Sequence, residues 1–482
     1  MNLKDKKVLV MGLGVLGGGV ATAKWLVRHG ARVTVTDMRT KSELEASIRS
    51  LGSAAKKIKF ILGEHRKEDF EWNDIIVVNP AVRRESEYLA VAKKRKRLLV
   101  NDARIFFDVV ENPVIAVTGT RGKTTTTNWV AHFLRTRNKN VAAAGNSSNL
   151  ALLDLADRLK STKTPVVVEL SSWHLERLPG SKYAPEIAVI TNLSSDHLNR
   201  YREMEDYARA KANIFKGQKK DQKLVLNGDS RWTAFFLKLH PKAKIYFFSL
   251  RRLSKSKNGI FLKNGSLFFQ ENGRSEEVIS EGAVSLTRKR GEHNVINLMA
   301  AALAAHLAGI SWFEIAAAVR GLPEIKYREE IILEKEGLRV VNDSAATSPD
   351  AVMAAIRRFH GDGRLILITG GTDKNLDFKP LAKEIRSALP SGDVFFLNGS
   401  ATKRLIAELK KQNYFKKGGP QLFEDLESIV ERVKILSPKP YPLNPVVVLF
   451  SPGAASFEKF KNEFDRGEKF NGYVKRWLDT NG

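Results

Sequence analysis

The stretch VIAVTGTRGKTTTTNWV, residues 114–130, constrains the fold of this chain more than any other part of it. Its opening apolar run predicts a buried strand, and the threonine-rich run after Lys123 predicts a helix. Val117 stands where the longest form of the nucleotide-binding loop has a glycine, but the turn ends in Gly-Lys-Thr. In such loops backbone N–H groups surround phosphate, the lysine neutralises the β and γ oxygens, and the threonine hydroxyl binds Mg²⁺. The sequence therefore predicts a strand, a phosphate loop and a helix that together bind a nucleotide.

Strand-turn-helix units recur along the chain. Further strand-like runs are KKVLVMGLG near the N-terminus and GLRVVNDS, RLILITGG and PVVVLFSPG in the last third. Apolar strands that alternate with amphipathic helices predict an α/β fold with parallel, doubly wound sheets. A chain of 482 residues accommodates three domains of roughly 150 residues each. Helical patterns stop near Pro113 and Pro323, so we predict domains at residues 1–111, 112–325 and 326–482.

The part of the chain from Arg251 to Glu281 has a different pattern. It contains three Asn-Gly dipeptides, which begin at Asn258, Asn264 and Asn272. Asn-Gly between short apolar runs is typical of tight hairpin turns. We therefore expect a hairpin appendage here.

A second glycine-rich turn, GLGVLG at residues 12–17, follows the first strand and opens a helix. Glycines in this place let the backbone approach a diphosphate at a helix N-terminus, and Asp37 at the end of the next strand would bind a ribose hydroxyl. Taken alone, the turn fits either a dinucleotide-dependent dehydrogenase or a tight structural turn without a ligand.

Composition limits the partners and the compartment. The net charge of +27 favours anionic partners, but the basic residues are spread along the chain, and the basic patches are not interleaved with the aromatic residues that bind single strands. We therefore expect a basic solvated surface and no specific nucleic-acid partner.

The chain has no cysteine, which excludes disulfides and thiol chemistry, and no apolar run approaches the roughly 20 residues that span a bilayer. Since the N-terminal residues lack a signal pattern, a cytoplasmic location without a membrane partner is expected.

Candidate metal ligands follow two further strands. Glu169 ends the strand of PVVVELSS, and Asp196 and His197 follow the strand of IAVITNLSSDHLNRY. A buried carboxylate is costly unless a cation accompanies it. Each residue alone fits a helix cap, a salt bridge or a structural histidine. Their order after a phosphate loop favours Mg²⁺ ligands.

Six motifs together resemble the central ATPase domain of the Mur ligase family. They are TGTRGKTTTT, GNSSN, ELSSWHLE, TNLSSDHLNRY, ARAKANIF and GEHNVINLMAA. Members of this family join amino acids to UDP-muramoyl peptides during peptidoglycan synthesis, and folylpolyglutamate synthetases belong to it as well. At the N-terminus GLG, TDMR and NPA, and at the C-terminus NDSAATSPDA, GGTDKNLDF and SPGAASFEKFKNEFDRG, extend the resemblance over the whole chain and to the branch that adds D-glutamate.

This resemblance implies an ATP-dependent ligase that joins D-glutamate to UDP-N-acetylmuramoyl-L-alanine through an acyl phosphate. It also implies a Rossmann-like N-terminal domain that binds UDP, a central P-loop ATPase domain and a Rossmann-like C-terminal domain. Two Mg²⁺ ions, small-molecule substrates and a monomeric state are expected. A ligase of this family for another amino acid, such as L-glutamate, and a folylpolyglutamate-type ligase remain alternatives.

The resemblance also implies roles for individual residues. The catalytic set is Lys123, His197 and Lys211, where Lys211 would be carbamylated and would hold the second metal. The metal ligands would be Thr124, Glu169, His197 and Lys211. ATP would be bound by Gly119, Thr120, Arg121, Gly122, Lys123, Thr124, Thr125, Asn294, Asn297, Arg328 and Asp343. The UDP substrate would be bound by Val15, Leu16, Asp37, Arg39 and Asn146, and the amino acid by Thr347, Lys374, Ser456 and Phe464.

Several positions depart from the commoner pattern of the family. Arg121 replaces the usual Asn or His of the phosphate loop, and Leu16 stands where a threonine is frequent. Ala345 stands where a lysine often follows Asn-Asp-Ser, which puts the identity of the amino acid in doubt more than the fold or the use of ATP. One extra residue in FKNEFDRG makes the role of Phe464 less secure than that of Ser456.

Overall fold

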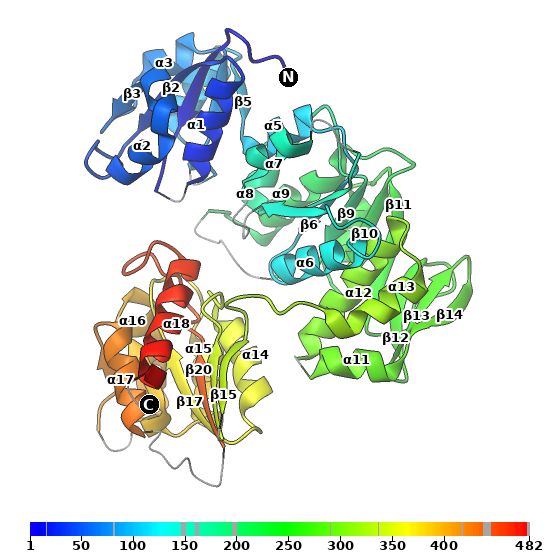
Figure 1. Ribbon diagram of the computed structural model, residues 1–482, viewed down its shortest axis with the longest axis vertical. Coiled ribbons are helices and arrows are strands. Elements are labelled where there is room, and N and C mark those ends of the chain that lie inside the picture. The colour runs from blue at the N-terminus through cyan, green and yellow to red at the C-terminus, as the bar shows by residue number, and fades with distance from the viewer. Residues whose placement is uncertain are drawn as a thin grey trace. The chain divides into compact units, whose positions relative to one another are not determined.

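Three sheets, each built mainly from parallel strands, carry the fold (Figure 1). The computed structural model describes residues 1–15, 17–80, 82–145, 151–159, 163–194, 200–289, 291–335, 337–415, 418–436 and 445–479. The predicted α/β class with parallel, doubly wound sheets is confirmed. The chain divides into two compact units, Met1–Pro323 and Glu324–Gly482. The domain borders expected from the sequence stay a prediction.

The first sheet has the strand order β3-β2-β1-β4-β5, with all strands parallel. Its strands are β1 (Lys7–Met11), β2 (Arg32–Asp37), β3 (Ile58–Leu62), β4 (Ile75–Val78) and β5 (Leu98–Val100). The helices of this region are α1 (Gly18–Arg28), α2 (Glu45–Leu51), η1 (Gly52–Lys57), α3 (Lys67–Trp72), α4 (Glu87–Lys94) and α5 (Asp102–Val109). The strand order reverses between β1 and β4, and ligands of open α/β sheets bind at such a switch point. The turn after β1 lies there.

The central sheet has the order β14-β13-β12-β11-β10-β9-β6-β8-β7. Its strands are β6 (Val114–Thr118), β7 (Ala142–Gly145), β8 (Val166–Glu169), β9 (Ile187–Ile190), β10 (Lys223–Asn227), β11 (Lys244–Ser249), β12 (Gly259–Lys263), β13 (Ser266–Glu271) and β14 (Arg274–Ile279). Strands β6, β8 and β9 are buried along their whole length, which explains their continuous apolar sequences. The switch point of this sheet lies between β6 and β9, where the phosphate loop begins.

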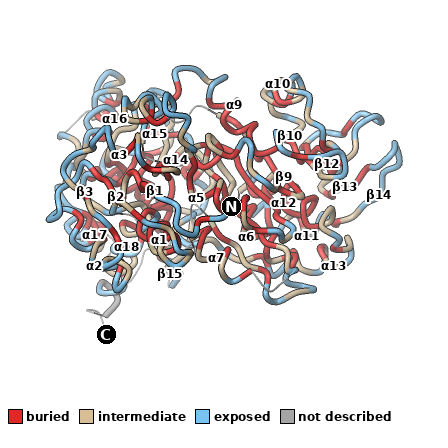
Figure 2. The backbone as a smooth tube through the Cα atoms, turned by 90° about the horizontal axis from the view of Figure 1, so that it is seen from above, coloured by how far each residue is buried: buried red, intermediate tan, exposed pale blue. Residues whose placement is uncertain are grey.

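Helices surround the central sheet. They are α6 (Lys123–Leu134), α7 (Leu152–Leu159), α8 (Ser172–Leu175), α9 (Met204–Lys216), α10 (Thr233–Lys238), α11 (Glu281–Arg288), α12 (Glu292–Leu307), α13 (Trp312–Ala318) and η2 (Val319–Gly321). Helix α12 is rich in alanine and leucine and is buried along most of its length, as the red tube in Figure 2 shows. It packs against α6, so the helix that follows the phosphate loop is covered.

The expected hairpin appendage is confirmed, but the Asn-Gly at Asn258 is not a hairpin turn, because β12 begins at Gly259 and pairs parallel with β11. Strands β12, β13 and β14 pair antiparallel at one edge of the central sheet. Asn264 and Asn272 have φ values of 48° and 51°, and the glycine after each also has a positive φ. These are the left-handed conformations that tight hairpin turns require. Strand β14 is mostly exposed (Figure 2).

The last sheet has the order β15-β16-β20-β17-β18-β19 and is parallel except for β15. Its strands are β15 (Glu330–Lys335), β16 (Leu338–Asn342), β17 (Arg364–Thr369), β18 (Val394–Leu397), β19 (Gln421–Phe423) and β20 (Val446–Phe450). Its helices are α14 (Pro349–Phe359), α15 (Lys379–Ala388), η3 (Ser391–Asp393), α16 (Ser400–Lys411), α17 (Leu426–Leu436) and α18 (Glu463–Asp479). The loops after β16, β20 and β17 therefore leave the same edge of three adjacent strands. No helix within the described residues is both long enough and apolar enough to span a membrane.

Candidate functional site

The phosphate loop is a close-fitting cradle between β6 and α6. Gly119 has a φ of 154° and Gly122 a φ of 76°, a region that side chains disfavour. A Cβ atom on Gly119 would lie 1.9 Å from Thr191 Oγ1, and one on Gly122 would lie 2.2 Å from Asn297 Oδ1. The sequence motif therefore folds as a loop that needs its glycines, which fits the predicted cradle for phosphate.

Asn192, in the loop after the neighbouring strand β9, holds this phosphate loop in place. Its Oδ1 accepts the Arg121 backbone N–H at 2.9 Å, and its Nδ2 donates to the Arg121 carbonyl at 3.1 Å. Thr191 Oγ1 donates to the same carbonyl at 2.5 Å. The backbone of Arg121 is thus held on both sides. Sequence reasoning missed Asn192, although it lies in the quoted TNLSSDHLNRY.

The same segment meets Thr120. The Thr120 backbone N–H donates to the Asn192 carbonyl at 3.0 Å, and the Ser194 N–H donates to Thr120 Oγ1 at 3.0 Å. The residues just before Asp196 and His197 are therefore held against the phosphate loop. Asp196 and His197 themselves lie outside the described residues.

Lys123 and Thr124 begin α6 immediately after the loop. The Lys123 ammonium donates to the Thr120 carbonyl at 3.0 Å, so it lies over the loop. Thr124 and Thr125 are buried, at 7% and 8% exposure. Position and burial fit a lysine that neutralises phosphate and a hydroxyl that binds a cation.

Glu169 and Lys211 both lie buried beside this cradle. Glu169 ends β8, which pairs with β6, and is 3% exposed. Lys211 is 1% exposed, and its Nζ donates to the Gly119 carbonyl at 2.8 Å. The Lys211 ammonium lies 4.5 Å from the ring centre of Tyr207, a further residue that the sequence did not single out. In the described part of the chain, no three His, Asp or Glu side chains gather as a ready metal centre.

The start of α12 brings two predicted nucleotide contacts to the loop. Asn297 Nδ2 donates to Asn294 Oδ1 at 3.1 Å, and both side chains are buried. The close approach of Asn297 Oδ1 to Gly122 places this pair against the phosphate loop. The structure thus brings Lys123, Glu169, Lys211 and the pair Asn294 and Asn297 to the phosphate loop.

The turn after β1 is organised around Asp37. Its Oδ2 accepts the Gly14 N–H at 3.0 Å, and its Oδ1 accepts the Arg39 N–H at 2.9 Å. Asn79 Nδ2 donates to the Gly12 carbonyl at 3.1 Å. Val15 is 48% exposed at this turn. The predicted partners Leu16 and Asn146 lie outside the described residues.

Four predicted amino-acid ligands belong to the C-terminal unit. Lys374 Nζ donates to Thr347 Oγ1 at 3.3 Å, which joins the loops after β16 and β17. Ser456, after β20, is 3% exposed, and its Oγ has no hydrogen-bond partner among the described residues. Phe464 is half-buried, with its ring centre 6.2 Å from that of Tyr327.

A buried arginine holds the loop that bears Ser456. Arg466 is fully buried, and its guanidinium donates to the carbonyls of Ala454 and Ala455 and to the carbonyl and hydroxyl of Ser344. Burial lowers the pKa of Arg466 to about 10, so the group stays charged at neutral pH. Its role was not predicted, because its bonds to Ser344 join residues that are 122 positions apart in the sequence.

Asp343 and Arg328, the other predicted nucleotide contacts, also lie in this unit. Asp343 is 6% exposed, its Oδ2 accepts the Ser451 hydroxyl at 2.7 Å, and its Oδ1 accepts the Glu329 N–H at 3.2 Å. Burial, together with the neighbouring Glu329, raises the pKa of Asp343. Arg328 is exposed.

The cradle allows a direct test with Gly122→Ala. We expect the free energy of unfolding to fall by about 1–2 kcal/mol, because an alanine is strained at a positive φ, and Mg-ADP binding to weaken, because the Asn297 amide must move. Thermal denaturation and calorimetry measure the two effects. Gly282→Ala in α11 is the control, because its added methyl meets no atom within 4 Å. If the two variants had the same stability and the same affinity for Mg-ADP, the loop would not need a glycine at position 122.

Known proteins resemble this chain over nearly its whole length. Models of the Mur ligase MurD-like N-terminal domain, the Mur ligase middle domain and the Mur ligase glutamate ligase domain match residues 6–100, 117–305 and 327–452. A UDP-N-acetylmuramoylalanine--D-glutamate ligase of Roseiflexus sp. (strain RS-1) is 38% identical over 98% of this chain and 99% of its own. One of Borreliella afzelii (strain PKo) is 33% identical over 98% of both chains.

A solved structure has the same fold. MurF from Acinetobacter baumannii aligns with a TM-score of 0.58 and 15% identity over 98% of this chain and 90% of its own. At this identity the likeness concerns the fold. The matched domain models cover each of the three sheets, and the curated relatives span nearly the full length. The chain belongs to the Mur ligase family.

Proposed function

We propose that the chain is an ATP-dependent ligase that joins D-glutamate to UDP-N-acetylmuramoyl-L-alanine during the synthesis of peptidoglycan precursors. The observation that carries this proposal is the 38% identity, over nearly the whole of both chains, to a relative that bears the name of this activity. The matched models include a MurD-like N-terminal domain and a glutamate ligase domain in the C-terminal part, which supports this branch of the family. Domains at residues 1–111, 112–325 and 326–482 would each contain one of the three sheets.

The reaction would begin when the substrate carboxylate attacks the γ-phosphoryl group of ATP, which forms an acyl phosphate and releases ADP. Lys123 at the start of α6 would neutralise the phosphate oxygens, while the N–H groups from Gly119 to Thr125 surround them. Thr124, Glu169 and His197 are the proposed ligands of two Mg²⁺ ions, which would screen the repulsion between the reacting anions. Asn294 and Asn297 would contact adenine, and Arg328 and Asp343 the phosphate and ribose.

Lys211 is the proposed carbamylated lysine. A carbamate forms when the neutral amine attacks CO₂ and loses a proton, which turns a cation into an anionic oxygen ligand for the second metal. The burial of Lys211 and its contact with the Gly119 carbonyl support this role, because they place the amine at the phosphate loop and away from solvent.

In the second step the D-glutamate amine would attack the carbonyl carbon of the acyl phosphate, which forms the amide bond and releases inorganic phosphate and a proton. Lys374 and Thr347 would bind a carboxylate of the incoming amino acid. Ser456 would offer its unpartnered hydroxyl, and Phe464 would pack nearby. At the other end of the reaction, the turn with Val15, Leu16, Asp37 and Arg39 would hold the UDP group, and Asn146 the muramoyl-alanine part.

The proposal is tested by measuring phosphate release from ATP with each substrate omitted in turn. We expect release only when UDP-N-acetylmuramoyl-L-alanine and D-glutamate are both present, and a product that has gained the mass of one glutamate residue. A panel of amino acids, with L-glutamate included, examines the effect of Ala345. Faster turnover with another amino acid, or release that needs neither substrate, would overturn the assignment. Folate substrates test the related branch of the family.

A further inference from the structure

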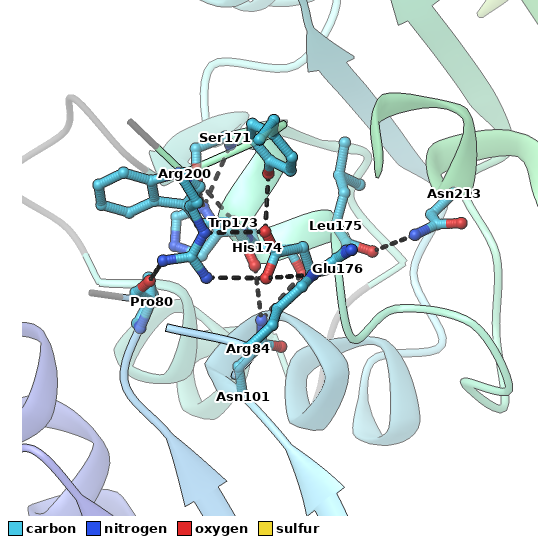
Figure 3. Close-up of polar contacts among 11 residues, drawn as sticks. Pro80, Arg84, Asn101, Ser171, Trp173, His174, Leu175, Glu176, Arg200 and Asn213 are labelled. Carbon is cyan, nitrogen blue, oxygen red and sulfur yellow. Dashed lines mark hydrogen bonds and ion pairs between the residues drawn. The ribbon is translucent and has the colours of Figure 1, made fainter. Parts of the chain in front are cut away.

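Glu176, a buried carboxylate outside the proposed catalytic set, contacts side chains from two other segments of the chain, at Arg84 and at Arg200 and Tyr201 (Figure 3). Glu176 follows α8, and its side chain is 4% exposed. Its Oε1 accepts Arg200 Nε at 2.9 Å and the Tyr201 hydroxyl at 2.7 Å, and its Oε2 accepts Arg200 Nη2 at 2.8 Å. Arg84 Nε lies 3.1 Å from Oε2. Arg200 and Glu176 thus form a bidentate ion pair, and Tyr201 and Arg84 contact the same carboxylate.

The charges in this cluster are unbalanced. Burial by itself would raise the pKa of Glu176, but the hydrogen bonds from Arg200 and Tyr201 and the charge of Arg84 outweigh it and hold the pKa below its ordinary value. Burial lowers the pKa of Arg177, Glu176 acts in the opposite direction, and Arg84 and Arg200 lower it further. Glu176 is therefore the counter-charge of several neighbouring guanidinium groups, and its loss would leave them to repel one another.

The short helix α8 places Glu176 firmly. Asn101 Nδ2 donates to the His174 carbonyl at 2.9 Å, and Asn213 Nδ2 donates to the Leu175 carbonyl at 3.0 Å (Figure 3). The Arg200 guanidinium lies 4.9 Å from the ring centre of Trp173. The carbonyls at the end of α8 are thus held by side chains from elements on either side of it in the sequence.

One arm of the cluster leads to the turn after β1. Arg200 Nη1 donates to the Pro80 carbonyl at 2.8 Å. The residue before Pro80 is Asn79, whose amide donates to the Gly12 carbonyl and whose Cβ lies 2.9 Å from where a Gly12 side chain would begin. Arg84, four residues after Pro80, also forms an ion pair with Glu176. Two consecutive residues therefore connect the ion pair with the proposed UDP-binding turn.

The described residues on either side of His197 have contacts of their own. Arg200 follows His197 by three positions in the sequence. On the far side of His197, Ser194 is bonded to Thr120 of the phosphate loop. The segment that contains His197 is thus bounded by one anchor at the phosphate loop and one at Glu176.

We infer that Glu176 and Arg200 are positioning residues for the ligase reaction, and that their ion pair fixes the proposed UDP-binding turn relative to the end of α8. The inference rests on the proposed function. Neither residue belongs to the proposed catalytic set. The pair acts on the turn through Pro80 and Asn79.

The test measures steady-state kinetics and melting temperature for Glu176→Gln, Arg200→Lys and Arg84→Met. For Glu176→Gln and Arg200→Lys we expect kcat/KM for UDP-N-acetylmuramoyl-L-alanine to fall by about 100-fold, because small displacements of bound reactants have effects of this size. KM for ATP should change by less than about threefold, because the phosphate-loop contacts remain. The Arg84 side chain is 43% exposed, so Arg84→Met carries little risk of misfolding. We expect this variant also to lower kcat/KM for the UDP substrate, through a higher KM.

Asp108→Asn is the matched control. Arg104 and Asp108 form a comparably buried pair, at 15% and 7% exposure, and their other partners are Pro179, Gly180 and Lys182. This variant should lower the melting temperature and leave kcat/KM for the UDP substrate within about threefold of the wild-type value. An unchanged kcat/KM for the UDP substrate in Glu176→Gln and Arg200→Lys, with active wild-type protein, would overturn the inference alone. A wild-type chain that does not turn over these substrates would remove the proposed function, and the inference with it.

Discussion

Lys123→Met is expected to lower kcat by about 1,000-fold or more, because a cation that stabilises a transferring phosphoryl group contributes on this scale. The Lys123 ammonium lies over the loop, 3.0 Å from the Thr120 carbonyl, where nucleotide phosphate would meet it. Methionine keeps the length and the apolar stem of the side chain and removes the charge. The rate of ATP-dependent product formation at saturating substrate measures the effect.

The fold should survive this substitution, because Lys123 begins its helix and is not part of an apolar core. Lys139→Met, at an exposed lysine, is the matched control and should retain wild-type turnover. If the Lys123→Met protein had the wild-type melting temperature and a turnover within about tenfold of wild type, Lys123 would not be needed for phosphoryl transfer.

Lys211→Met is expected to have an effect of similar size, by a different route. If Lys211 carries a carbamate, the variant loses an anionic metal ligand, and we expect kcat to fall by about 100- to 1,000-fold. The wild-type protein should also lose activity in CO₂-depleted buffer and regain it when bicarbonate is added. A carbamate carbon should appear in the NMR spectrum after incubation with ¹³C-labelled bicarbonate.

Lys219→Met, just beyond the end of α9, is the control for a lysine that is exposed to solvent. It should leave turnover and its dependence on CO₂ unchanged. Wild-type activity that is independent of CO₂, together with no carbamate signal, would show that Lys211 acts as an unmodified amine. In that case its contact with the Gly119 carbonyl would be its main contribution.

The parts of the fold that depend on neighbouring residues were predictable from the sequence. The apolar run before the phosphate loop is a buried strand, Gly122 has the positive φ that such loops need, and Asn264 and Asn272 form the expected hairpin turns. These features are encoded within a few residues, so one stretch of sequence suffices to predict them.

Contacts between distant segments were not predictable in the same way. A lysine on a helix is usually exposed to solvent, and the burial of Lys211 depends on packing of α9 against the loop after β6. Arg466 donates to Ser344, which is 122 residues away in the sequence. Asn192 and Glu176 stand inside quoted motifs, yet nothing in those motifs shows that one fastens the phosphate loop and the other gathers arginines.

The bonds from Asn192 to Arg121 have a consequence for the thermodynamics of nucleotide binding. The phosphate loop is held by side-chain bonds within the protein itself, so its conformation is set when the chain folds. Ordering a loop on binding would cost about 1–2 kcal/mol of backbone entropy per residue. A preorganised loop avoids that loss, so the affinity for nucleotide would reflect the phosphate contacts themselves.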